Sequence, residues 1–529
     1  MTQVYYIDEQ LFQSILWPFL CCLVVPYPED RDTGLLSFQS FSKIFIKIIW
    51  CASLNAPCNH YIRTAAVITL TLELAIMSHL SMLWTLCFLL ITYCIRSLCS
   101  HNNCSGFATL ILMFACDHLV ENISSLAPPI AAAPVTALSP IASVQIFQVC
   151  LFSLILICTL STITYWILAA WPLGGGNGRL NMRERLEDTD GGAMDITVRL
   201  LVTSAIAAVV VVSVTMPYLA CITADNLAVV VAAQLYRNCR TSMFWCSIIA
   251  ASIHLASQSV KRDRWCIGSW SLPCSKTIVR KIYHVAAVAM FSPALAIYAE
   301  SLSFVSLAMG GAVCLFLAVE FVRCFLLVNV PSGRSDGLGP MVDALNAFLA
   351  SFQESSTPPS PVEGDRAGRI LMRPIIFSHI SLLLGVGSPV WLYCRYCASD
   401  PLSHSAGRHG EVSLRPLLIM GLATVGVGDT AASVVGSLFG RLRWPGSKKT
   451  YLGTVAAFVS MEIYAVGMSV TEWWRWPPKL AVGASVCMTL TFLLAALAEA
   501  VTTENDNILL PLYASTVFLS LRYCMNAAL

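Results

Sequence analysis

The sequence predicts an all-α fold, a polytopic integral membrane helical bundle with about 13–15 transmembrane helices. Of the 529 residues, 57% are hydrophobic and 12% are charged, which is about half the charged fraction of a typical soluble domain. Apolar runs of about 20 residues, the length that crosses a bilayer, recur from one end of the chain to the other. The pattern lacks the strands of alternating polarity that a membrane barrel needs, so the apolar runs are expected to be helices.

Fourteen apolar runs define the expected membrane segments. The first follows Asp8 and Glu9 instead of a basic stretch, so it is expected to be a membrane segment and not a cleavable signal. The long second run is compatible with one helix or with two short ones. In chain order the runs are Leu11–Tyr27, Ala65–Ile95, Gly106–Val120, Ala142–Trp171, Val198–Leu219, Ala224–Leu235, Met243–Ala256, Ile282–Tyr298, Leu302–Val330, Ile375–Tyr396, Leu417–Phe439, Val455–Val470, Leu480–Val501 and Ile508–Leu521.

Three polar stretches, Pro172–Asp195, Ser332–Arg373 and Asp400–Arg415, interrupt this pattern. The first contains three consecutive glycines and the second a segment rich in Ser and Pro, so both are expected to be flexible loops or linkers. The net charge of +2 gives no case for a nucleic-acid partner. The 22 cysteines are scattered through apolar runs, where a free Cys behaves as a small hydrophobe.

Basic residues in the short loops predict how the chain is oriented in the membrane. The loop Ser257–Lys281 carries six Lys or Arg residues, which places it in the cytoplasm. Four spans later the chain returns to the same side at the basic loop Arg441–Lys449, and two further spans bring Thr502–Asn507 there. The polar ends of these helices are therefore expected to share one cytosolic face.

The first polar group stands at the entrance to a predicted membrane helix and reads Arg280-Lys281-Ile282-Tyr283-His284. Lys and Arg commonly flank membrane helices and Tyr is frequent at the interface, so topology alone explains much of this group. His284 lies deeper, where an ionisable side chain is costly unless it has a partner or lines a pathway.

The most informative carboxylate is Asp429, which lies inside an apolar run. Such a residue indicates a functional site by default. Gly426 and Gly428 beside it permit a broken helix and a close backbone approach to a ligand. Gly436 and Gly440 are better explained by helix packing.

A basic loop follows this segment and offers two ammonium groups, hydroxyls and exposed backbone N–H groups. These are the groups that neutralise and hold a triphosphate. Gly446 is followed by Ser447 and not by Lys, so the loop is not a P-loop, and no βαβ unit surrounds the dinucleotide-like glycines of Gly426–Ala431. The candidate nucleotide-binding residues are Gly446, Ser447, Lys448, Lys449, Thr450, Gly453 and Thr454.

Two further groups place acidic residues near predicted helix ends. Glu320 and Arg323 are spaced i, i+3 and can pair on one helix face, which leaves a structural and a catalytic role open. Glu499 lies within a predicted span, and Asp506 precedes the next one. Capping of a helix N-terminus is a sufficient explanation for Asp506 but not for Glu499.

Taken together, the motifs resemble the dolichol kinase family of polyprenol kinases, which is related more distantly to phosphatidate cytidylyltransferases. The resemblance divides the chain into an N-terminal multi-span membrane region, 1–279, and a C-terminal catalytic membrane domain, 280–529. One departure is Leu452, which stands where the family usually has Glu. The matching motifs, in the family's order, are Arg280-Lys281-x-Tyr283-His284, Glu320-x-x-Arg323, His379-x-x-Leu382-Leu383-Leu384-Gly385, Gly428-Asp429-Thr430-Ala431-Ala432-Ser433, Trp444-Pro445-Gly446-x-Lys448-Lys449-Thr450-x-x-Gly453-Thr454, and Glu499-Ala500-x-Thr502 with Asp506-Asn507 and Leu510-Pro511.

The resemblance implies CTP-dependent phosphorylation of dolichol, or a related polyprenol, to dolichyl phosphate for protein glycosylation. It also implies a multi-pass protein of the endoplasmic reticulum membrane with its active site facing the cytosol. The residues themselves do not distinguish CTP from ATP. The basic loops independently predict that these motifs face the cytosol, and this agrees with the resemblance because nucleoside triphosphates are cytosolic.

The resemblance also suggests roles for individual residues. Lys281, His284, Asp429 and Asp506 are the candidate catalytic residues. Asp429, Asp506 and Glu499 are candidate ligands of a divalent cation, expected to be Mg²⁺, which prefers carboxylate, phosphate and water oxygens. The sequence does not decide whether Asp429, Asp506 or His284 orients the lipid hydroxyl. The supporting residues are Arg280, Tyr283, Glu320, Arg323, Thr502 and Asn507.

Two kinds of alternative remain open. One is another CTP-dependent lipid-alcohol kinase or a cytidylyltransferase, acting on phytol, diacylglycerol or phosphatidate. The other is a membrane transporter, which also has many spans, broken helices and intramembrane carboxylates. Against a transporter, no inverted repeat is visible in the sequence and the polar motifs gather on one face.

Overall fold

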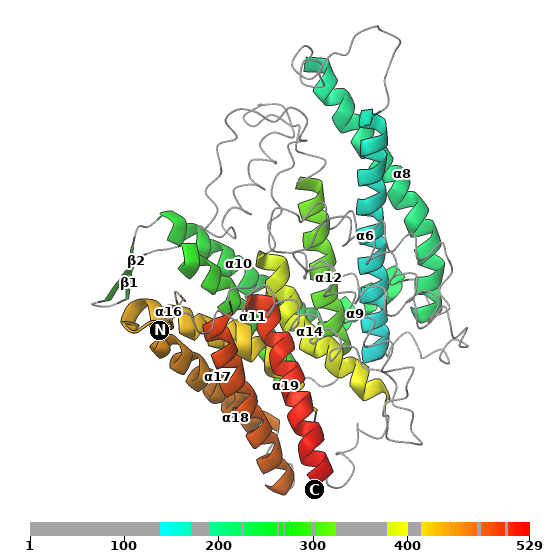
Figure 1. Ribbon diagram of the computed structural model, residues 1–529. Coiled ribbons are helices and arrows are strands. Elements are labelled where there is room, and N and C mark those ends of the chain that lie inside the picture. Colours follow the sequence, from blue (N-terminus) through cyan, green and yellow to red (C-terminus); the bar gives the residue numbers. More distant parts are fainter. Residues whose placement is uncertain are drawn as a thin grey trace, which may run out of the picture.

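A computed structural model of the chain is almost entirely helical in the part that it describes (Figure 1). The predicted runs Leu11–Tyr27, Ala65–Ile95 and Gly106–Val120 lie outside that part, so the count of about 13–15 spans stays a prediction. The described residues are 138–170, 190–223, 227–261, 264–267, 270–273, 276–297, 302–323, 378–399, 414–445, 447, 449–472, 478–502 and 506–528.

Several described segments are apolar enough, over a sufficient length, to cross a membrane. Five of them have 19 or more residues: Pro140–Cys158, Leu302–Phe321, Leu417–Phe439, Tyr451–Ser469 and Val482–Ala500. Shorter apolar helical segments are Ser204–Pro217, Leu227–Arg237 and Ser378–Cys394. The prediction of an all-α, polytopic helical membrane protein is confirmed.

The first described helices are α6 (Pro140–Ala170), α8 (Asp190–Thr223), α9 (Leu227–Arg237) and α10 (Cys239–Lys261). Helix α8 begins inside the stretch Pro172–Asp195 that the sequence analysis assigned to a loop, so the last six residues of that stretch are helical.

The predicted cytoplasmic loop after α10 contains a short antiparallel hairpin of β1 (Arg264–Ile267) and β2 (Trp270–Pro273). This hairpin is the one addition that the described residues make to the expected all-α fold.

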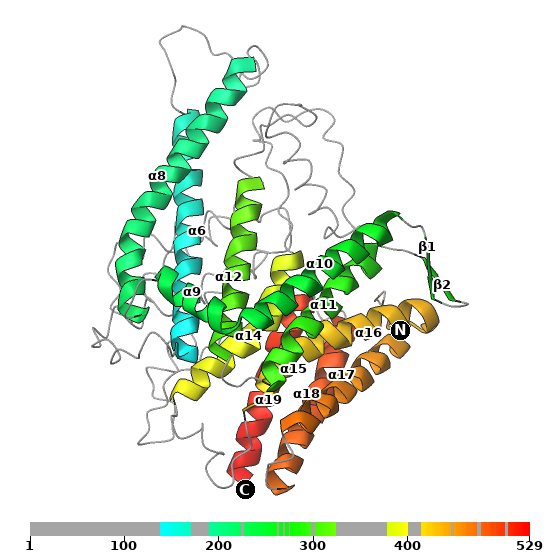
Figure 2. The same ribbon diagram turned by 180° about the vertical axis from the view of Figure 1, so that it is seen from behind.

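The remaining elements build the C-terminal part of the molecule (Figure 2). They are α11 (Lys276–Ile297), α12 (Leu302–Phe321), α14 (Ser378–Ser399), α15 (Leu417–Gly421), η4 (Leu422–Gly428), α16 (Asp429–Phe439), α17 (Tyr451–Glu472), α18 (Pro478–Val501) and α19 (Asp506–Ala528).

One apolar core joins α6, α11, α12 and α14 to η4 and α19. At its centre the ring of Phe147 lies 4.4 Å from that of Trp391, centroid to centroid. Gly310 makes room for Phe147, because a Cβ on this glycine would lie 2.5 Å from the ring. The Trp391 indole N–H donates to the carbonyl of Ser306 at 3.2 Å, which satisfies its polar atom in the apolar interior.

A second apolar core lies between α15, α17, α18 and α19. Phe492 and Phe518 are fully buried there, among small residues such as Ala457 and Ala495. The outer faces of α17 and α18 remain apolar and exposed, as shown by Ile463 at 67% and Val482 at 62%. Such faces are expected on helices that contact lipid.

The segment from α15 to α16 is continuous and changes helix type in the middle. Seven residues, Leu422–Gly428, form a π-helix that ends directly before Asp429. Gly426 packs against α11, because a Cβ there would lie 2.3 Å from Val288. The broken helix that the glycines permitted is therefore a widened helix, a feature that is frequent at functional sites.

Candidate active site

The buried half of the site joins α11 to α16. Lys281, on the second turn of α11, donates to the Oδ2 atom of Asp429, the first residue of α16, and the two side chains are 9% and 6% exposed. His284 lies one turn further along α11, with its Nε2 atom 3.5 Å from the same carboxylate oxygen. Ser433 donates to the other oxygen, Oδ1, at 3.3 Å. Both oxygens of the Asp429 carboxylate are thus in contact with polar groups.

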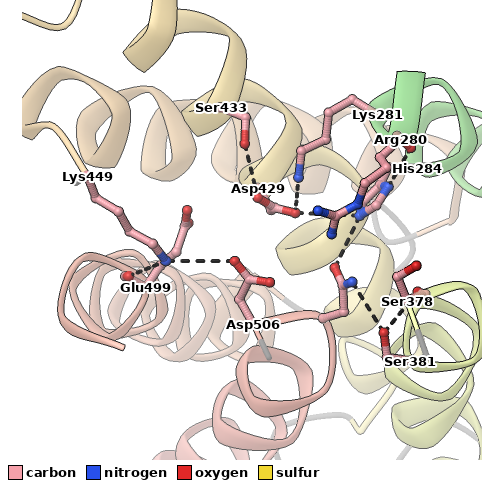
Figure 3. A network of polar contacts seen from close by, with 11 residues as sticks. Arg280, Lys281, His284, Ser378, Ser381, Asp429, Ser433, Lys449, Glu499 and Asp506 are labelled. Atoms are coloured by element: carbon pink, nitrogen blue, oxygen red, sulfur yellow. Dashed lines mark hydrogen bonds and ion pairs between the residues drawn. The ribbon is translucent and has the colours of Figure 1, made fainter. Parts of the chain in front are cut away.

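His284 is held between two helices besides its own. Its Nδ1 atom lies 3.0 Å from the carbonyl oxygen of Arg280, and its Nε2 atom lies 3.1 Å from Oδ1 of Asn507 on α19. Asn507 in turn donates through Nδ2 to Ser381 on α14 at 3.4 Å. The imidazole ring is therefore fixed in orientation, with one edge toward Asp429 (Figure 3).

The open half of the site joins the basic loop to α18 and α19. The ammonium group of Lys449 donates to the carbonyl oxygen of Glu499 at 2.6 Å and lies 3.7 Å from Oδ2 of Asp506. The side chains of Lys449 and Asp506 are 31% and 27% exposed, so this half is accessible from outside. In Figure 3, Lys281 and Lys449 approach the acidic groups from opposite sides. We call Lys281, Asp429, Lys449, Glu499 and Asp506 the charged cluster.

Electrostatics couple the two halves of the cluster. Burial, followed by the negative charge of Asp429, raises the pKa of Asp506 above its usual range, and the positive charge of Lys449 opposes that shift. The charge state of Asp506 in the open half therefore depends on Asp429 in the buried half.

The basic loop is closed by contacts among its own residues. Thr450 accepts the backbone N–H of Gly453 at 3.1 Å, so its hydroxyl caps the N-terminus of α17. Thr454 accepts the indole N–H of Trp444 at 3.0 Å, and Ser447 accepts the backbone N–H of Lys449 at 3.1 Å.

These contacts show what the candidate nucleotide-binding groups do in this structure. The hydroxyls of Ser447, Thr450 and Thr454 and the N–H of Gly453 shape the loop, while Lys449 reaches the cluster. Gly446 and Lys448 lie outside the described residues.

The packing explanation for Gly436 and Gly440 is confirmed. A Cβ on Gly436 would lie 2.8 Å from Oγ1 of Thr450, and one on Gly440 would lie 2.5 Å from the same atom. These glycines bring α16 against the start of α17, which places Asp429 and the basic loop beside each other. Leu452, at the family's usual Glu position, is 43% exposed on the first turn of α17.

The other predicted residues make contacts outside the charged cluster. Arg323 donates to both oxygens of Glu320, at 3.0 and 2.5 Å, which is the buried i, i+3 pair that the spacing predicts. This pair is close enough to His379, on the first turn of α14, to interact with it electrostatically. Tyr283 is half-buried against the first apolar core, and the backbone N–H of Thr502 closes the last turn of α18.

The fit of a divalent cation depends on the ligands that it finds here. Among the described residues, no group of three or more His, Cys, Asp or Glu side chains is arranged to hold a metal ion by itself. Asp429 and Asp506 nevertheless face a common space (Figure 3). Mg²⁺ commonly takes one or two carboxylates and completes its shell with phosphate oxygens and water. The donor set therefore fits a cation that arrives together with a nucleotide.

The sequence motif Gly428–Ser433 includes Ser433 but gives that residue no role, and Ser381 is not singled out by any sequence pattern. Both hydroxyls touch site residues, since Ser433 donates to Asp429 and Ser381 accepts from Asn507. The spacing of Asp429 and Ser433, i to i+4 on one helix, is the signal that could have identified Ser433. Ser381 carries no comparable signal, because its partner is 126 residues away.

Comparison with known proteins gives a consistent result. No protein-family model matches the chain, and no solved structure matches it either. Human dolichol kinase is 34% identical over 238 residues, which cover 45% of this chain and 37% of the relative. A dolichol kinase from Arabidopsis thaliana is 28% identical over 280 residues, which cover 51% of this chain and 38% of the relative.

The dolichol kinase of Saccharomyces cerevisiae is 26% identical over 271 residues, covering 51% of this chain and 40% of the relative. The match thus spans less than half the length of each of these relatives. Over about half of its own length, this chain is similar to dolichol kinases from an animal, a plant and a yeast, and the resemblance that its motifs indicate is confirmed.

Proposed function

We propose that this protein is a dolichol kinase, which transfers the γ-phosphoryl group of CTP to the terminal hydroxyl of dolichol. The observation that carries the proposal is the charged cluster. Two lysines, the carboxylates of Asp429 and Asp506 and the main chain of Glu499 meet there, and they come from five separate segments. Phosphoryl transfer asks a protein mainly to position its reactants and neutralise charge, and this cluster provides groups for both. Similarity to proteins named dolichol kinase supports dolichol as the acceptor.

The open half of the cluster is the proposed nucleotide site. Lys449 is partly exposed and, in this structure, is held by a carbonyl oxygen and a carboxylate 3.7 Å away, so its ammonium group can turn toward phosphate oxygens at small cost. Lys448 directly precedes Lys449 in the sequence and adds a second positive charge. The donor CTP is proposed from the family resemblance, since the cluster recognises phosphates and not a base.

The buried half is the proposed site of the reacting groups. The dolichol oxygen forms a bond to the γ-phosphorus while the bond to the β,γ-bridging oxygen breaks, giving dolichyl phosphate and CDP. The hydroxyl proton passes to Asp429, Asp506 or His284 and from there to water. Lys281 donates to the Asp429 carboxylate and adds positive charge beside the transferred group.

Asp429 and Asp506 are the proposed carboxylate ligands of Mg²⁺, with Glu499 next to them. When bound, the cation would neutralise phosphate oxygens and hold them in place. The two aspartates come from the starts of α16 and α19, so their separation depends on how these helices pack.

The proposed location is the endoplasmic reticulum membrane, with the site facing the cytosol. The basic residues of the two loops beside the site support this orientation by the positive-inside rule. The isoprenoid tail would lie between helices or in the lipid, where an apolar chain needs no soluble pocket.

A labelled-donor experiment tests the proposal. Purified protein is incubated with dolichol and either γ-labelled CTP, α-labelled CTP or γ-labelled ATP. The expected result is labelled dolichyl phosphate from γ-labelled CTP and labelled CDP from α-labelled CTP. Label transfer from ATP but not from CTP would identify ATP as the donor. CMP attached to the lipid would identify a cytidylyltransferase. Absence of any transfer would reject the proposed function.

A further inference from the structure

Helix α14 contributes no residue to the charged cluster, but it touches the segments that carry both aspartates. Its first contact is through Ser381, which is fully buried. The hydroxyl of Ser381 donates to the carbonyl of Ser378 at 2.9 Å and accepts the side-chain N–H of Asn507 at 3.4 Å. Asn507 directly follows Asp506 and also contacts His284, so this chain of bonds ends on both halves of the site.

The second contact is between backbones, one turn further along α14. A Cβ on Gly385 would lie 1.8 Å from the backbone oxygen of Asn507 and 3.0 Å from its carbonyl carbon. No side chain fits at that distance, and the obstacle is main chain, which cannot rotate away. Gly385 therefore allows the start of α19 to rest directly on α14.

The same turn of α14 also receives the segment that leads to Asp429. A Cβ on Gly421, the last residue of α15, would lie 2.6 Å from the carbonyl oxygen of Gly385 and 2.7 Å from Cα of Val386. From this contact the π-helix η4 continues for seven residues to Asp429. Three backbones thus meet at Gly385, and two of them lead to the aspartates of the site.

We infer that Ser381 and Gly385 are positioning residues that set the separation of Asp429 and Asp506 and the orientation of His284. Reacting groups must be held closely, since a displacement of about 1 Å can cost about a hundredfold in rate. A contact between two main chains is stiffer than a contact between side chains, because main-chain atoms cannot move away by a change of rotamer. The inference rests on the proposed function, in which the two aspartates act together.

Gly385→Ala tests the backbone contact, and Gly310→Ala is its matched control. Both glycines lie at tight helix contacts, but Gly310 faces Phe147 and is in the apolar core. Gly385→Ala is expected to lower kcat at least about a hundredfold and to raise the half-activating Mg²⁺ concentration, because Asp506 moves away from Asp429. Gly310→Ala is expected to lower the unfolding temperature while the folded enzyme keeps its kinetic constants.

Ser381→Ala tests the hydrogen-bond chain without adding an atom, and Ser515→Ala is its control. Ser515 is equally buried, but its hydroxyl bonds to Pro511 within α19. Loss of one neutral hydrogen bond is expected to lower kcat about three- to tenfold in Ser381→Ala, with the KM for dolichol unchanged. Ser515→Ala is expected to leave both constants unchanged.

Hydrogen–deuterium exchange over α19 provides a readout that does not depend on activity. Faster exchange near Asn507 in Gly385→Ala, together with the loss in kcat, is the expected result. Unchanged exchange, or faster exchange with wild-type kinetic constants, would overturn the inference. The two proposals can fail separately. If the wild-type protein has no kinase activity, the proposed function is rejected. Faster exchange over α19 in Gly385→Ala would then still show that Gly385 holds the start of α19 in place.

Discussion

The molecule uses close glycine contacts in two regions, and the neighbours of the glycines differ. In the apolar core, Gly310 on α12 makes room for Phe147 on α6. Beside the charged cluster, Gly385 on α14 makes room for the backbone of Asn507 on α19. The same packing device therefore stabilises the bundle in one region and places ionisable groups in the other.

The two regions also differ in the free energy of burying their side chains. Burial of Phe147 and Trp391 is favourable by itself, because it removes apolar surface from water. Burial of Lys281 and Asp429 is tolerated only as a pair, because each charge alone would lose its hydration without compensation. Changes in the apolar core should therefore affect stability and leave the kinetic constants unchanged. Changes in the cluster should lower catalysis, and those that leave a buried charge unpaired should lower stability as well.

The largest expected effect is on catalysis in the cluster. Asp429→Ala and Lys449→Ala should each lower kinase activity by about a thousandfold or more, because each removes a charge next to the transferred phosphoryl group. Label transfer from γ-labelled CTP to dolichol measures this effect, with membrane insertion checked separately. Arg441→Ala is the control, since Arg441 is exposed in the same loop region and should be neutral. Wild-type turnover in either cluster variant would contradict the assigned roles.

The next effect concerns the stability of the buried pair. Lys281→Met leaves the Asp429 carboxylate buried without its ammonium partner and should cost about 3–5 kcal/mol. The double variant Lys281→Met/Asp429→Asn should recover most of this loss, because neither member is then charged. Unfolding in detergent measures both variants. A double variant no more stable than the single one would argue against a paired interior.

A smaller effect is expected in the apolar core. Phe147→Leu should lower the free energy of unfolding by about 1–2 kcal/mol, because the ring beside Trp391 and Gly310 is lost. The KM values for nucleotide and dolichol should stay within error of wild type. Altered KM values with unchanged stability would remove the distinction between the two regions.

The smallest effect concerns a single hydroxyl of the site. Ser433→Ala removes the 3.3 Å hydrogen bond to Asp429 and should lower kcat about fivefold. Ser437→Ala on the same helix is the matched control, because that hydroxyl is exposed and bonds to Val434 of its own backbone. Steady-state kinetics compare the two variants, and equal rates in both would exclude a role for Ser433.

Much of this organisation could be predicted from the sequence. Apolar runs gave the helices, and loop charge gave the expectation that the ends of α11, α17, α18 and α19 lie together. The structure brings Lys281, Asp429, Lys449 and Asp506 into one cluster. A carboxylate inside a membrane segment is energetically costly, so it is seldom present without a function. Asp429 therefore indicated the position of the site.

Other features could not be predicted, for physical reasons. The π-helix of Leu422–Gly428 depends on tertiary contacts at Gly421 and Gly426, which no local pattern encodes. The partnership of Asn507 with Ser381 joins residues far apart in the chain. The capping role of Thr450 could not be predicted, because a threonine in a basic loop is equally compatible with phosphate binding.

A cross-linking experiment can show whether the basic loop and the start of α19 converge. Lys449→Cys and Asp506→Cys are combined in a cysteine-depleted protein in sealed membranes and treated with a short bifunctional thiol reagent added from the cytosolic side. We expect rapid cross-linking of this pair. We expect none for Lys449→Cys with Ser485→Cys, because Ser485 lies about 21 Å from Glu499 along α18. Failure of the first pair to react would show that Lys449 and Asp506 are not neighbours, and reaction only from the lumenal side would place the site on the wrong face of the membrane.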